Sequence, residues 1–339
     1  MAEPAHPARG PDDGPRGLGG PGGGAVASGA AGTGHAAGGG GSVVAEVPRG
    51  QAAVDGLVHL LDLESIEVDI FRGVSPTVSL QRVFGGQVAG QALVAAGRTV
   101  SAERPVHSLH AYFLRPGDPS VPIVYLVDRL RDGRSFTARR VVAVQHGQAI
   151  FSLSASFQNV EEGIDHQGVM PPAPDPRTLP TLAERYAPYA EQLGALARIP
   201  RPIDLRYVDD PPFVRRAAGE RGEPHTRVWM RADGTLPDDP LLHVCALTYA
   251  SDFTLLDSVL STHGLAWMAD VRGASLDHAM WFHRPFRADE WLLYESDSPS
   301  ASGGRGLATG RIWSRDGLHV ASVVQEGLVR VIRPPVAGD

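Results

Sequence analysis

One short motif occurs twice in this chain, and the spacing that follows it repeats as well. The sequence YFLRP at 112–116 matches WFHRP at 281–285. A glycine typical of a hairpin turn comes 31 residues after the proline of the first motif, at Gly147, and 32 residues after the proline of the second, at Gly317. Internal duplication is the simplest account of this pattern, so we expect two copies of one folding unit.

The first copy reads as helices followed by antiparallel strands. A helix begins near Gln51, a short strand covers Ile66–Phe71, and a helix of small residues spans 83–100. Small residues let another backbone or a ligand approach closely. Strand-like segments follow at His107–Leu114, Pro122–Leu130, Ser135–Gln145 and Ala149–Gln158. In the last segment apolar residues alternate with serine, which predicts a strand with one buried face.

The same order of elements recurs in the second copy. A proline-rich connector over 160–200, with a helical patch at Leu182–Leu196, leads to it. Its central element is the apolar segment Leu241–Leu256, which has the length of a helix. Its strands are expected at Pro202–Val208, His225–Arg231, Ala274–Phe282, Trp291–Glu295, Leu307–Ser314 and Leu318–Arg330. Two copies paired edge to edge would bury both long helices against one continuous sheet, an α+β architecture.

Composition along the chain indicates the domain boundaries. Residues 1–41 hold 15 of the 40 glycines and offer little to bury, which predicts a disordered Gly/Ala-rich tail over 1–47. We expect an N-terminal domain over 48–160, a linker over 161–200 and a C-terminal domain over 201–335. The tail lacks the features of a secretory signal or a transit peptide, and no apolar run approaches the ~20 residues of a membrane span, so we expect a cytoplasmic protein.

Residue usage excludes several classes of function. All 31 basic residues are arginine, which removes phosphate-binding, Schiff-base and Ser-Lys lysines. A net charge of -7 argues against a nucleic-acid surface. The single cysteine, Cys245, excludes an intramolecular disulfide and a thiolate metal cluster, and reads as a core residue. The run GGQVAG at 85–90 is not a dinucleotide-binding fingerprint, because Gln87 replaces the second glycine, and close helix packing is favoured instead.

The apolar segment Leu241–Leu256 contains one carboxylate, that of Asp252. Burying a carboxylate without a partner is costly. Asp252 therefore either caps the helix or lies where water or substrate reaches it.

Two further polar residues of the second copy are candidates for the same site. Aligning the two hairpin glycines sets Ala155 against Gln325, so an amide stands where the first copy has a methyl group. Ser275 lies 23 residues after Asp252 and 50 before Gln325. A serine on a strand is most often merely solvated. A helix wrapped by strands, however, would bring Asp252, Ser275 and Gln325 to one place.

Other polar arrangements are weaker candidates. Asp277 and His278 could serve a serine nucleophile, but they are neighbours on a strand and face opposite ways, and no G-x-S-x-G elbow occurs. The possible metal ligands are His107 with His110 and His278 with His283. Both spacings are odd, so the members of each pair would point to opposite faces of a strand, and we expect no catalytic metal.

Long motifs throughout the chain carry a family resemblance. They are RVFGGQVAGQAL (82–93), HSLHAYFLRPGD (107–118), RDGRSFTARRV (131–141), SASFQ (154–158), YASDFTLL (249–256), LDHAMWFHRPF (276–286) and VVQEGLVR (323–330). With these motifs the sequence over 51–332 closely resembles acyl-CoA thioesterase II, a family of double-hotdog thioesterases. The resemblance implies two tandem hotdog folds, each a long helix wrapped by an antiparallel sheet.

The resemblance also implies hydrolysis of acyl-CoA to free fatty acid and CoA, with no metal or organic cofactor. It places the family's catalytic aspartate on Asp252, its hydroxyl residue on Ser275 and its glutamine on Gln325, although family members usually have threonine at the serine position. The three would direct one water to the thioester carbonyl without a covalent intermediate. A hotdog enoyl-CoA hydratase or dehydratase and a non-catalytic acyl-CoA-binding protein stay open as alternatives. Exposed sheet edges favour a homo-oligomer.

Overall fold

The computed structural model describes residues 48–76, 82–193, 201–267 and 269–332. The tail predicted over 1–47 lies outside these ranges, as do the end of the predicted helical patch Leu182–Leu196 and the last residues of the predicted C-terminal domain.

In the described residues thirteen strands form one antiparallel sheet. The first half of the chain supplies β1 (Glu64–Glu67), β2 (Ile70–Gly73), β3 (Val106–Phe113), β4 (Ile123–Asp132), β5 (Phe136–Gln145) and β6 (Gln148–Gln158). The second half supplies β7 (Ile203–Tyr207), β8 (His225–Ala232), β9 (Val271–Ser275), β10 (Asp277–Phe282), β11 (Leu292–Ser302), β12 (Arg305–Ser314) and β13 (His319–Val331). The strand order is β1-β2-β4-β5-β6-β3-β10-β13-β12-β11-β8-β7, and β9 pairs with β13.

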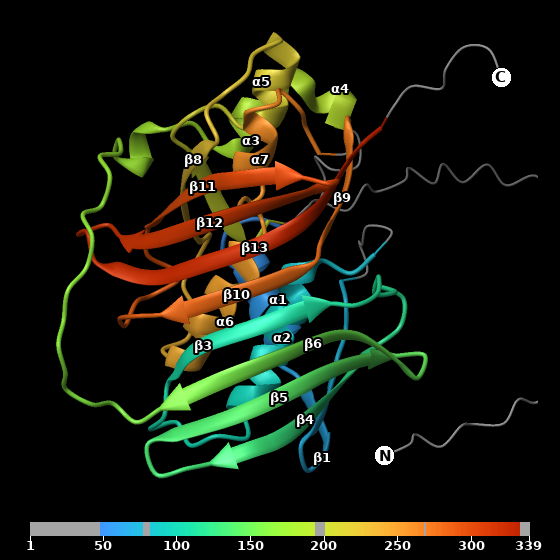
Figure 1. Cartoon of the computed structure of the whole chain (residues 1–339), viewed down its shortest axis with the longest axis vertical. Coiled ribbons are helices and arrows are strands. Elements are labelled where there is room, and N and C mark those ends of the chain that lie inside the picture. The colour runs from blue at the N-terminus through green and yellow to red at the C-terminus, as the bar shows by residue number, and fades with distance from the viewer. Residues whose placement is uncertain (1–47, 77–81, 194–200, 268, 333–339) are drawn as a thin grey trace, which may run out of the picture. The chain divides into compact units, whose positions relative to one another are not determined.

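The helices gather mainly on one face of this sheet. They are α1 (Gln51–Leu61), α2 (Gly85–Gly97), α3 (Leu182–Tyr186), α4 (Ala190–Leu193), α5 (Pro212–Ala218), α6 (Pro240–Ser251) and α7 (Asp257–Ser261). In Figure 1 α1, α2 and α6 lie behind the strands, where they cover the inner face. Within the described ranges no helix is long and apolar enough to cross a membrane.

The two copies join through β3 and β10. Tyr112, the first residue of the first motif, lies opposite Asp277, and Trp281, the first residue of the second motif, lies opposite Ser108. In both cases the partner residue lies four positions before the start of the other motif. Two copies of one unit related by a twofold axis produce this symmetric pairing. The sheet is continuous across this pair, which confirms the expected edge-to-edge arrangement and protects one edge of each copy.

The two long helices, α2 and α6, run antiparallel and close together. A Cβ atom at Gly86 would collide with the carbonyl oxygen of Tyr249, and one at Gly97 would collide with the side chain of Leu241. The small residues of α2 thus allow the close approach expected from the sequence, with helix α6 as the partner. As a consequence, the N-terminus of α2 lies beside the C-terminus of α6.

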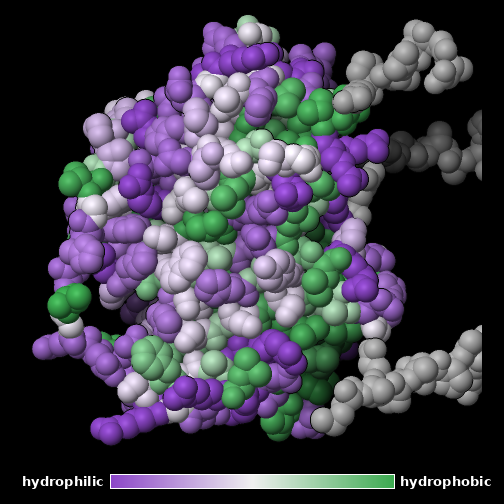
Figure 2. Space-filling model, viewed as in Figure 1, coloured by the Kyte–Doolittle hydropathy of each residue, from purple (hydrophilic) through white to green (hydrophobic). Residues whose placement is uncertain are grey.

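Alternation along the strands gives the sheet two different faces. Along β6, Phe151, Leu153, Ala155 and Phe157 are buried while the serines between them are partly or fully exposed, as predicted. Figure 2 shows the opposite, outer face, where hydrophilic and hydrophobic side chains are interspersed. The continuous apolar core therefore lies between the sheet and the helices.

Several expected boundaries were wrong, and the strand expected at Trp291–Glu295, for example, continues as β11 to Ser302. Three others were wrong for local reasons. The predicted helix over Leu241–Leu256 ends at Ser251, although the apolar run continues because the residues after the helix stay in the core. The single strand expected at Ile66–Phe71 is the β1-β2 hairpin, whose turn holds Asp69 at φ 59°. The strand expected at Ala274–Phe282 is divided at Leu276, where pairing with β3 begins.

The connector crosses the outer face of the second copy. There Met170 and Leu179 pack against a cluster that contains Trp229, Trp291 and Trp313. The indole nitrogen of Trp229 also donates to a connector carbonyl, that of Pro174, at 2.9 Å. These contacts hold the connector against the sheet, on the face opposite the helices.

Candidate active site

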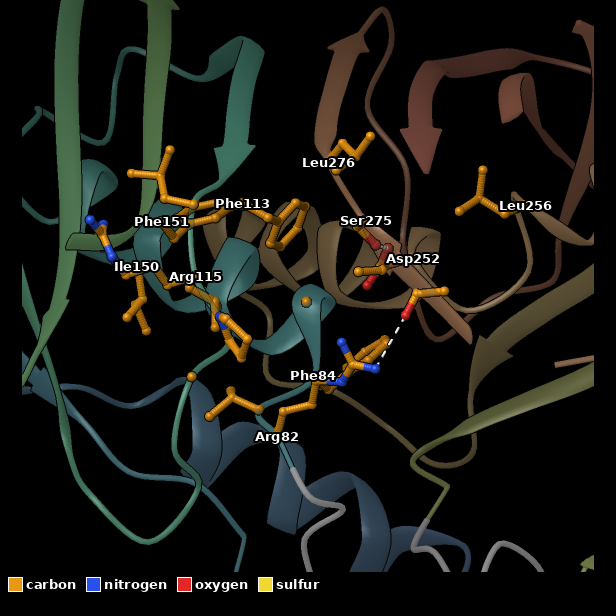
Figure 3. A pocket seen from close by; sticks show the side chains of 18 of the residues that line it. Arg82, Phe84, Phe113, Arg115, Ile150, Phe151, Asp252, Leu256, Ser275 and Leu276 are labelled. Atoms are coloured by element: carbon orange, nitrogen blue, oxygen red, sulfur yellow. Dashed lines mark hydrogen bonds between the residues drawn. The ribbon is translucent and has the colours of Figure 1, made fainter. Parts of the chain in front are cut away.

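A cavity of about 500 Å³ opens where the two copies meet. Its lining comes from the start of α2, the end of β3, the residues after α6, and β9 (Figure 3). Most of the wall is apolar, with side chains such as Phe84, Phe113 and Leu256. Asp252 is the one carboxylate among the described residues that line this cavity. An apolar cleft with a single acid suits a substrate with an apolar part and one reacting centre.

The helix ends fix the position of Asp252. Asp239 caps the start of α6, where its carboxylate accepts from the backbone N–H of Leu241 at 2.9 Å, and Pro240 occupies the first turn. Asp252 is the residue that ends the helix. Its carboxylate faces the start of α2, since a Cβ atom at Gly85 would lie 2.6 Å from Asp252 Oδ2. The positive end of the α2 dipole therefore lies beside a carboxylate at the negative end of α6.

The structure brings the three predicted residues together. The Ser275 hydroxyl donates to Asp252 Oδ1 at 3.1 Å, and the Gln325 amide Nε2 donates to the same oxygen at 2.8 Å. Asp252 and Ser275 line the cavity, whereas Gln325 is only 1% exposed and reaches the site through its bond to the carboxylate. Two donors on Oδ1 leave Oδ2 as the oxygen that faces Gly85.

Burial makes Asp252 a stronger base than an ordinary carboxylate. Desolvation raises the pKa of the Asp252 carboxyl, while hydrogen bonds from Gln325, Ser275 and the Gly86 backbone act in the opposite direction, as would a positive charge on His278 if its ring were protonated. Desolvation is the larger effect, because the cavity walls and the two packed helices keep most water away from the carboxylate. A carboxylate with a raised pKa accepts a proton from water more readily.

His278 belongs to the same cluster and was not assigned to it from the sequence. Its Nδ1 lies 3.0 Å from Gln325 Oε1, and its Nε2 lies 2.8 Å from the Ser251 hydroxyl oxygen. Burial lowers the pKa of the His278 imidazole, which favours the neutral ring. Because Gln325 Oε1 can only accept, Nδ1–H donates to it, and in the neutral ring Nε2 then accepts the single Ser251 hydroxyl proton in place of the Thr248 carbonyl, which lies 2.9 Å from the same hydroxyl oxygen. The Gln325 amide then presents its NH₂ group to Asp252.

The first copy lacks this cluster at the corresponding positions. The β10-β13 register continues from Ala279 opposite Val324 to His278 beside Gln325. In the first copy, Leu109 on β3 lies opposite Ala155 on β6. A leucine and an alanine therefore replace the histidine and the glutamine. The sequence alignment had identified the glutamine but not the histidine.

The alternative sites considered from the sequence, an Asp277–His278 pair and two histidine pairs, are not formed by the described residues. The Asp277 carboxylate accepts from the backbone N–H of Glu326 at 2.7 Å, so it does not orient the His278 ring. Among the predicted metal ligands, His107 bonds to Ser156 and His283 bonds to Ser322. Neither histidine pair forms a shared site within the described residues.

One other group of side chains is close enough to share a metal ion. It consists of His225, Glu295 and Asp297 on β8 and β11. An Arg311 nitrogen lies 3.1 Å from a Glu295 oxygen and 3.9 Å from an Asp297 oxygen. Arg311 thus pairs with Glu295, and His225 Nδ1 lies 2.8 Å from Asp297 Oδ1, so the cluster is an ion-pair network and we assign no metal to it.

The contact between Gly85 and Asp252 is expected to limit what position 85 tolerates. In Gly85→Ala the new methyl group would meet Asp252 Oδ2 at 2.6 Å and the Phe113 ring at 2.9 Å, so the carboxylate must move. We expect kcat to fall roughly 10-fold or more, since small displacements of a catalytic group are costly. Steady-state kinetics would measure this change in kcat.

Gly56→Ala is the matched control for that change, because a Cβ atom there meets nothing within 4 Å. On the exposed face of α1 it should raise the free energy of unfolding by about 0.5–1 kcal/mol and leave kcat alone. Equal kcat for Gly85→Ala and the unchanged protein would show that Asp252 is not held by this contact.

Comparison with known proteins defines the class of fold. A hot dog fold protein of unknown function from Alicyclobacillus acidocaldarius is 22% identical and superposes with a TM-score of 0.67 over 83% of this chain and 99% of that one. An acyl-CoA thioesterase II from Mycobacterium marinum is 50% identical, with a TM-score of 0.67 over 81% of this chain and 98% of that one. The fold is a double hotdog, as expected, with two helix-on-sheet copies in one chain.

Sequence comparison then identifies the family. The acyl-CoA thioesterase model matches residues 199–328, and the model of the acyl-CoA thioesterase N-terminal domain matches residues 74–158. Human acyl-coenzyme A thioesterase 8 is 43% identical over 82% of this chain and 89% of the human protein. This chain belongs to the acyl-CoA thioesterase family.

Proposed function

We propose that this enzyme hydrolyses fatty acyl-CoA thioesters to free fatty acid and CoA, with Asp252 as the general base. The observation that carries the proposal is the position of Asp252: it is the carboxylate of an apolar cavity, and two donors hold one of its oxygens. Its other oxygen faces the start of α2. Membership of the acyl-CoA thioesterase family supports the same reaction.

The reaction needs one water and no covalent intermediate. Asp252 Oδ2 takes a proton from the water while the water oxygen forms a bond to the thioester carbonyl carbon. The carbon–sulfur bond then breaks and the fatty acid forms. The CoA thiolate takes the proton back from the Asp252 carboxyl group and leaves as the thiol. A thiolate is a stable leaving group, so direct attack by water is sufficient.

The other residues prepare Asp252 and the carbonyl. Ser275 and Gln325 fix the carboxylate through Oδ1, and His278 fixes the Gln325 amide. The first N–H groups of α2 have no partner within the helix, and Gly85 lines the cavity. Because the Gly86 backbone already bonds to Asp252, the N–H of Gly85 is the one that would donate to the carbonyl oxygen as it becomes negative. The first copy would thus supply an oxyanion donor, and the second copy would supply the base.

The decisive assay is release of free CoA thiol from saturated acyl-CoA substrates across a series of chain lengths. Thiol release at catalytic enzyme concentrations is expected. Hydration of an enoyl-CoA without thiol release would support the hydratase alternative. Stoichiometric binding of acyl-CoA without turnover would support the binding-protein alternative. Both of those outcomes contradict the proposal.

The serine at position 275 is expected to accept its larger homologue. Ser275→Thr keeps the hydroxyl that donates to Asp252 Oδ1 and restricts its rotation, so kcat should stay within about threefold of the parent value, less than 1 kcal/mol in barrier. Ser275→Ala removes the donor and should lower kcat by roughly tenfold. Collapse of activity in Ser275→Thr alone would show that the hydroxyl is not what position 275 contributes.

The division of the chain into domains stays a prediction. We propose an N-terminal hotdog domain over 48–160 and a C-terminal one over 201–335 that carries the catalytic residues, joined by a linker over 161–200. The two family models, over 74–158 and 199–328, support these limits. A homo-oligomer and a cytoplasmic location likewise stay predictions of the sequence.

A further inference from the structure

Two arginines line the cavity from opposite sides of the α2 start. Arg82 lies before α2 and Arg115 lies after β3, and both are exposed (Figure 3). An Arg82 Nη2 donates to the backbone carbonyl of Gly273 at 3.2 Å, and an Arg115 Nη1 donates to that of Ala149 at 2.7 Å. Each guanidinium is therefore held in place by a neutral group.

Neither guanidinium has an acidic partner among the described residues. Arginines elsewhere in the fold commonly do: Arg129 pairs with Asp69, and Arg287 pairs with Asp289. A guanidinium has five N–H donors, and the single hydrogen bond found for Arg82 and for Arg115 leaves most of them available. The cavity thus presents two positive charges whose donors face solvent or a ligand.

The proposed substrate carries the complementary charge. A CoA thioester joins an apolar acyl chain, through an uncharged pantetheine arm, to a nucleotide with a pyrophosphate and a 3′-phosphate. A protein with net charge -7 repels such a polyanion at long range, so attraction must come from local cations. Arginine suits phosphate because its planar fork donates two parallel hydrogen bonds.

We infer that Arg82 and Arg115 form the subsite for the phosphate groups of CoA. This inference rests on the thioesterase function proposed above and adds to it the residues that recognise the nucleotide end of the substrate. Arg82 is anchored to β9, two residues before Ser275. A phosphate bound there would be held against the strand that carries part of the catalytic cluster, with the acyl group inside the apolar cavity.

The test compares substrates that differ only in their phosphates. The substrates are an acyl-CoA, the same acyl-dephospho-CoA, and the acyl thioester of N-acetylcysteamine, which has no phosphate. For Arg82→Met and Arg115→Met, the ratio of kcat/KM on acyl-CoA to kcat/KM on the truncated thioester should fall roughly 10- to 100-fold. Inhibition by free CoA should weaken in parallel, and the loss should shrink at high salt.

Arg134→Met is the matched control, because Arg134 is exposed on the β4-β5 turn and lies outside the cavity lining. Its ratio should equal that of the parent enzyme. A loss that disappears on dephospho-CoA assigns the arginines to the 3′-phosphate, and a loss that persists assigns them to the pyrophosphate. Unchanged ratios in both cavity variants, or equal losses on all three substrates, would overturn the subsite. Failure of the parent enzyme to hydrolyse any of the thioesters would instead reject the proposed function.

Discussion

Asp252→Asn is expected to lower kcat by about 10²- to 10⁴-fold, the usual contribution of a general base. The amide has the shape of the carboxylate but cannot take a proton from water. Ser275 and Gln325, which both donate to Oδ1, can still bond to the amide oxygen. KM should therefore change little. Steady-state kinetics with an acyl-CoA substrate would measure both, and a kcat near the parent value would remove Asp252 from the mechanism.

The same variant, Asp252→Asn, should lose activity but gain stability against unfolding. Because the pKa of Asp252 is raised in the folded protein, folding favours its protonated form. The stability that protonated Asp252 contributes is fully present below the pKa that Asp252 has in the unfolded chain. It is lost as the pH rises through the raised pKa that Asp252 has in the folded protein. At neutral pH the parent enzyme keeps a buried charge that Asp252→Asn lacks. The variant is expected to unfold at higher denaturant concentration at pH 7, and the difference should vanish in acid.

The raised pKa of Asp252 should also appear in the pH profile of the parent enzyme, as a loss of activity on the acid side. The base must be ionised, so kcat/KM should fall as pH drops through the raised pKa of Asp252. Activity that persists at a pH where ordinary carboxylates are half protonated would contradict the proposed environment. A catalytic residue that costs stability is typical of enzyme active sites.

The duplication made much of the fold predictable from sequence. The two copies of the motif at 112–116 and 281–285 predicted a pseudo-symmetric pair, and β3 and β10 meet there. Comparison of the copies also selected Gln325 against Ala155. Such inference works where a polar residue interrupts an apolar position that its duplicate keeps apolar.

The same comparison could have found His278. It stands opposite Gln325 on the neighbouring strand, while the corresponding pair in the first copy is Leu109 and Ala155. The sequence interpretation tested His278 as a partner of its chain neighbour Asp277, which faces the other way, and as a metal ligand with His283, but not with Gln325. Its actual partner is 47 residues distant, and only the register of β10 on β13 brings the two together.

The contact between α2 and Asp252 was beyond what sequence could supply. Glycines in α2 indicate that something approaches closely, but they do not identify the partner. The approach of Gly85 to Asp252 joins residues of different copies, and it depends on the antiparallel packing of α2 on α6. The end of α6 was missed for a related reason: hydrophobicity continues past Ser251, because Leu255 and Leu256 remain buried after the helix stops.

Gln325→Ala is expected to lower kcat by roughly 10²-fold. It removes the amide that holds Asp252 Oδ1 at 2.8 Å, so the carboxylate can rotate away from the water. Gln325 is almost fully buried and acts through Asp252, so the loss should appear in kcat more than in KM. A loss confined to KM would contradict a positioning role.

His278 supplies the sharper test, because its effect should pass entirely through Gln325. His278→Leu, the residue type at the corresponding position of the first copy, leaves Gln325 Oε1 without its donor at 3.0 Å. The amide is then free to flip and turn its oxygen toward Asp252. In His278→Asn a side-chain NH₂ group can replace the Nδ1–H donor, so it should keep more activity than the leucine variant. If His278 acts only on the amide, Gln325→Ala combined with His278→Leu loses no more activity than Gln325→Ala alone, an interaction energy of about 1–3 kcal/mol. Fully multiplicative losses in the double variant would mean that the imidazole influences Asp252 directly, through its charge rather than through the orientation of the glutamine.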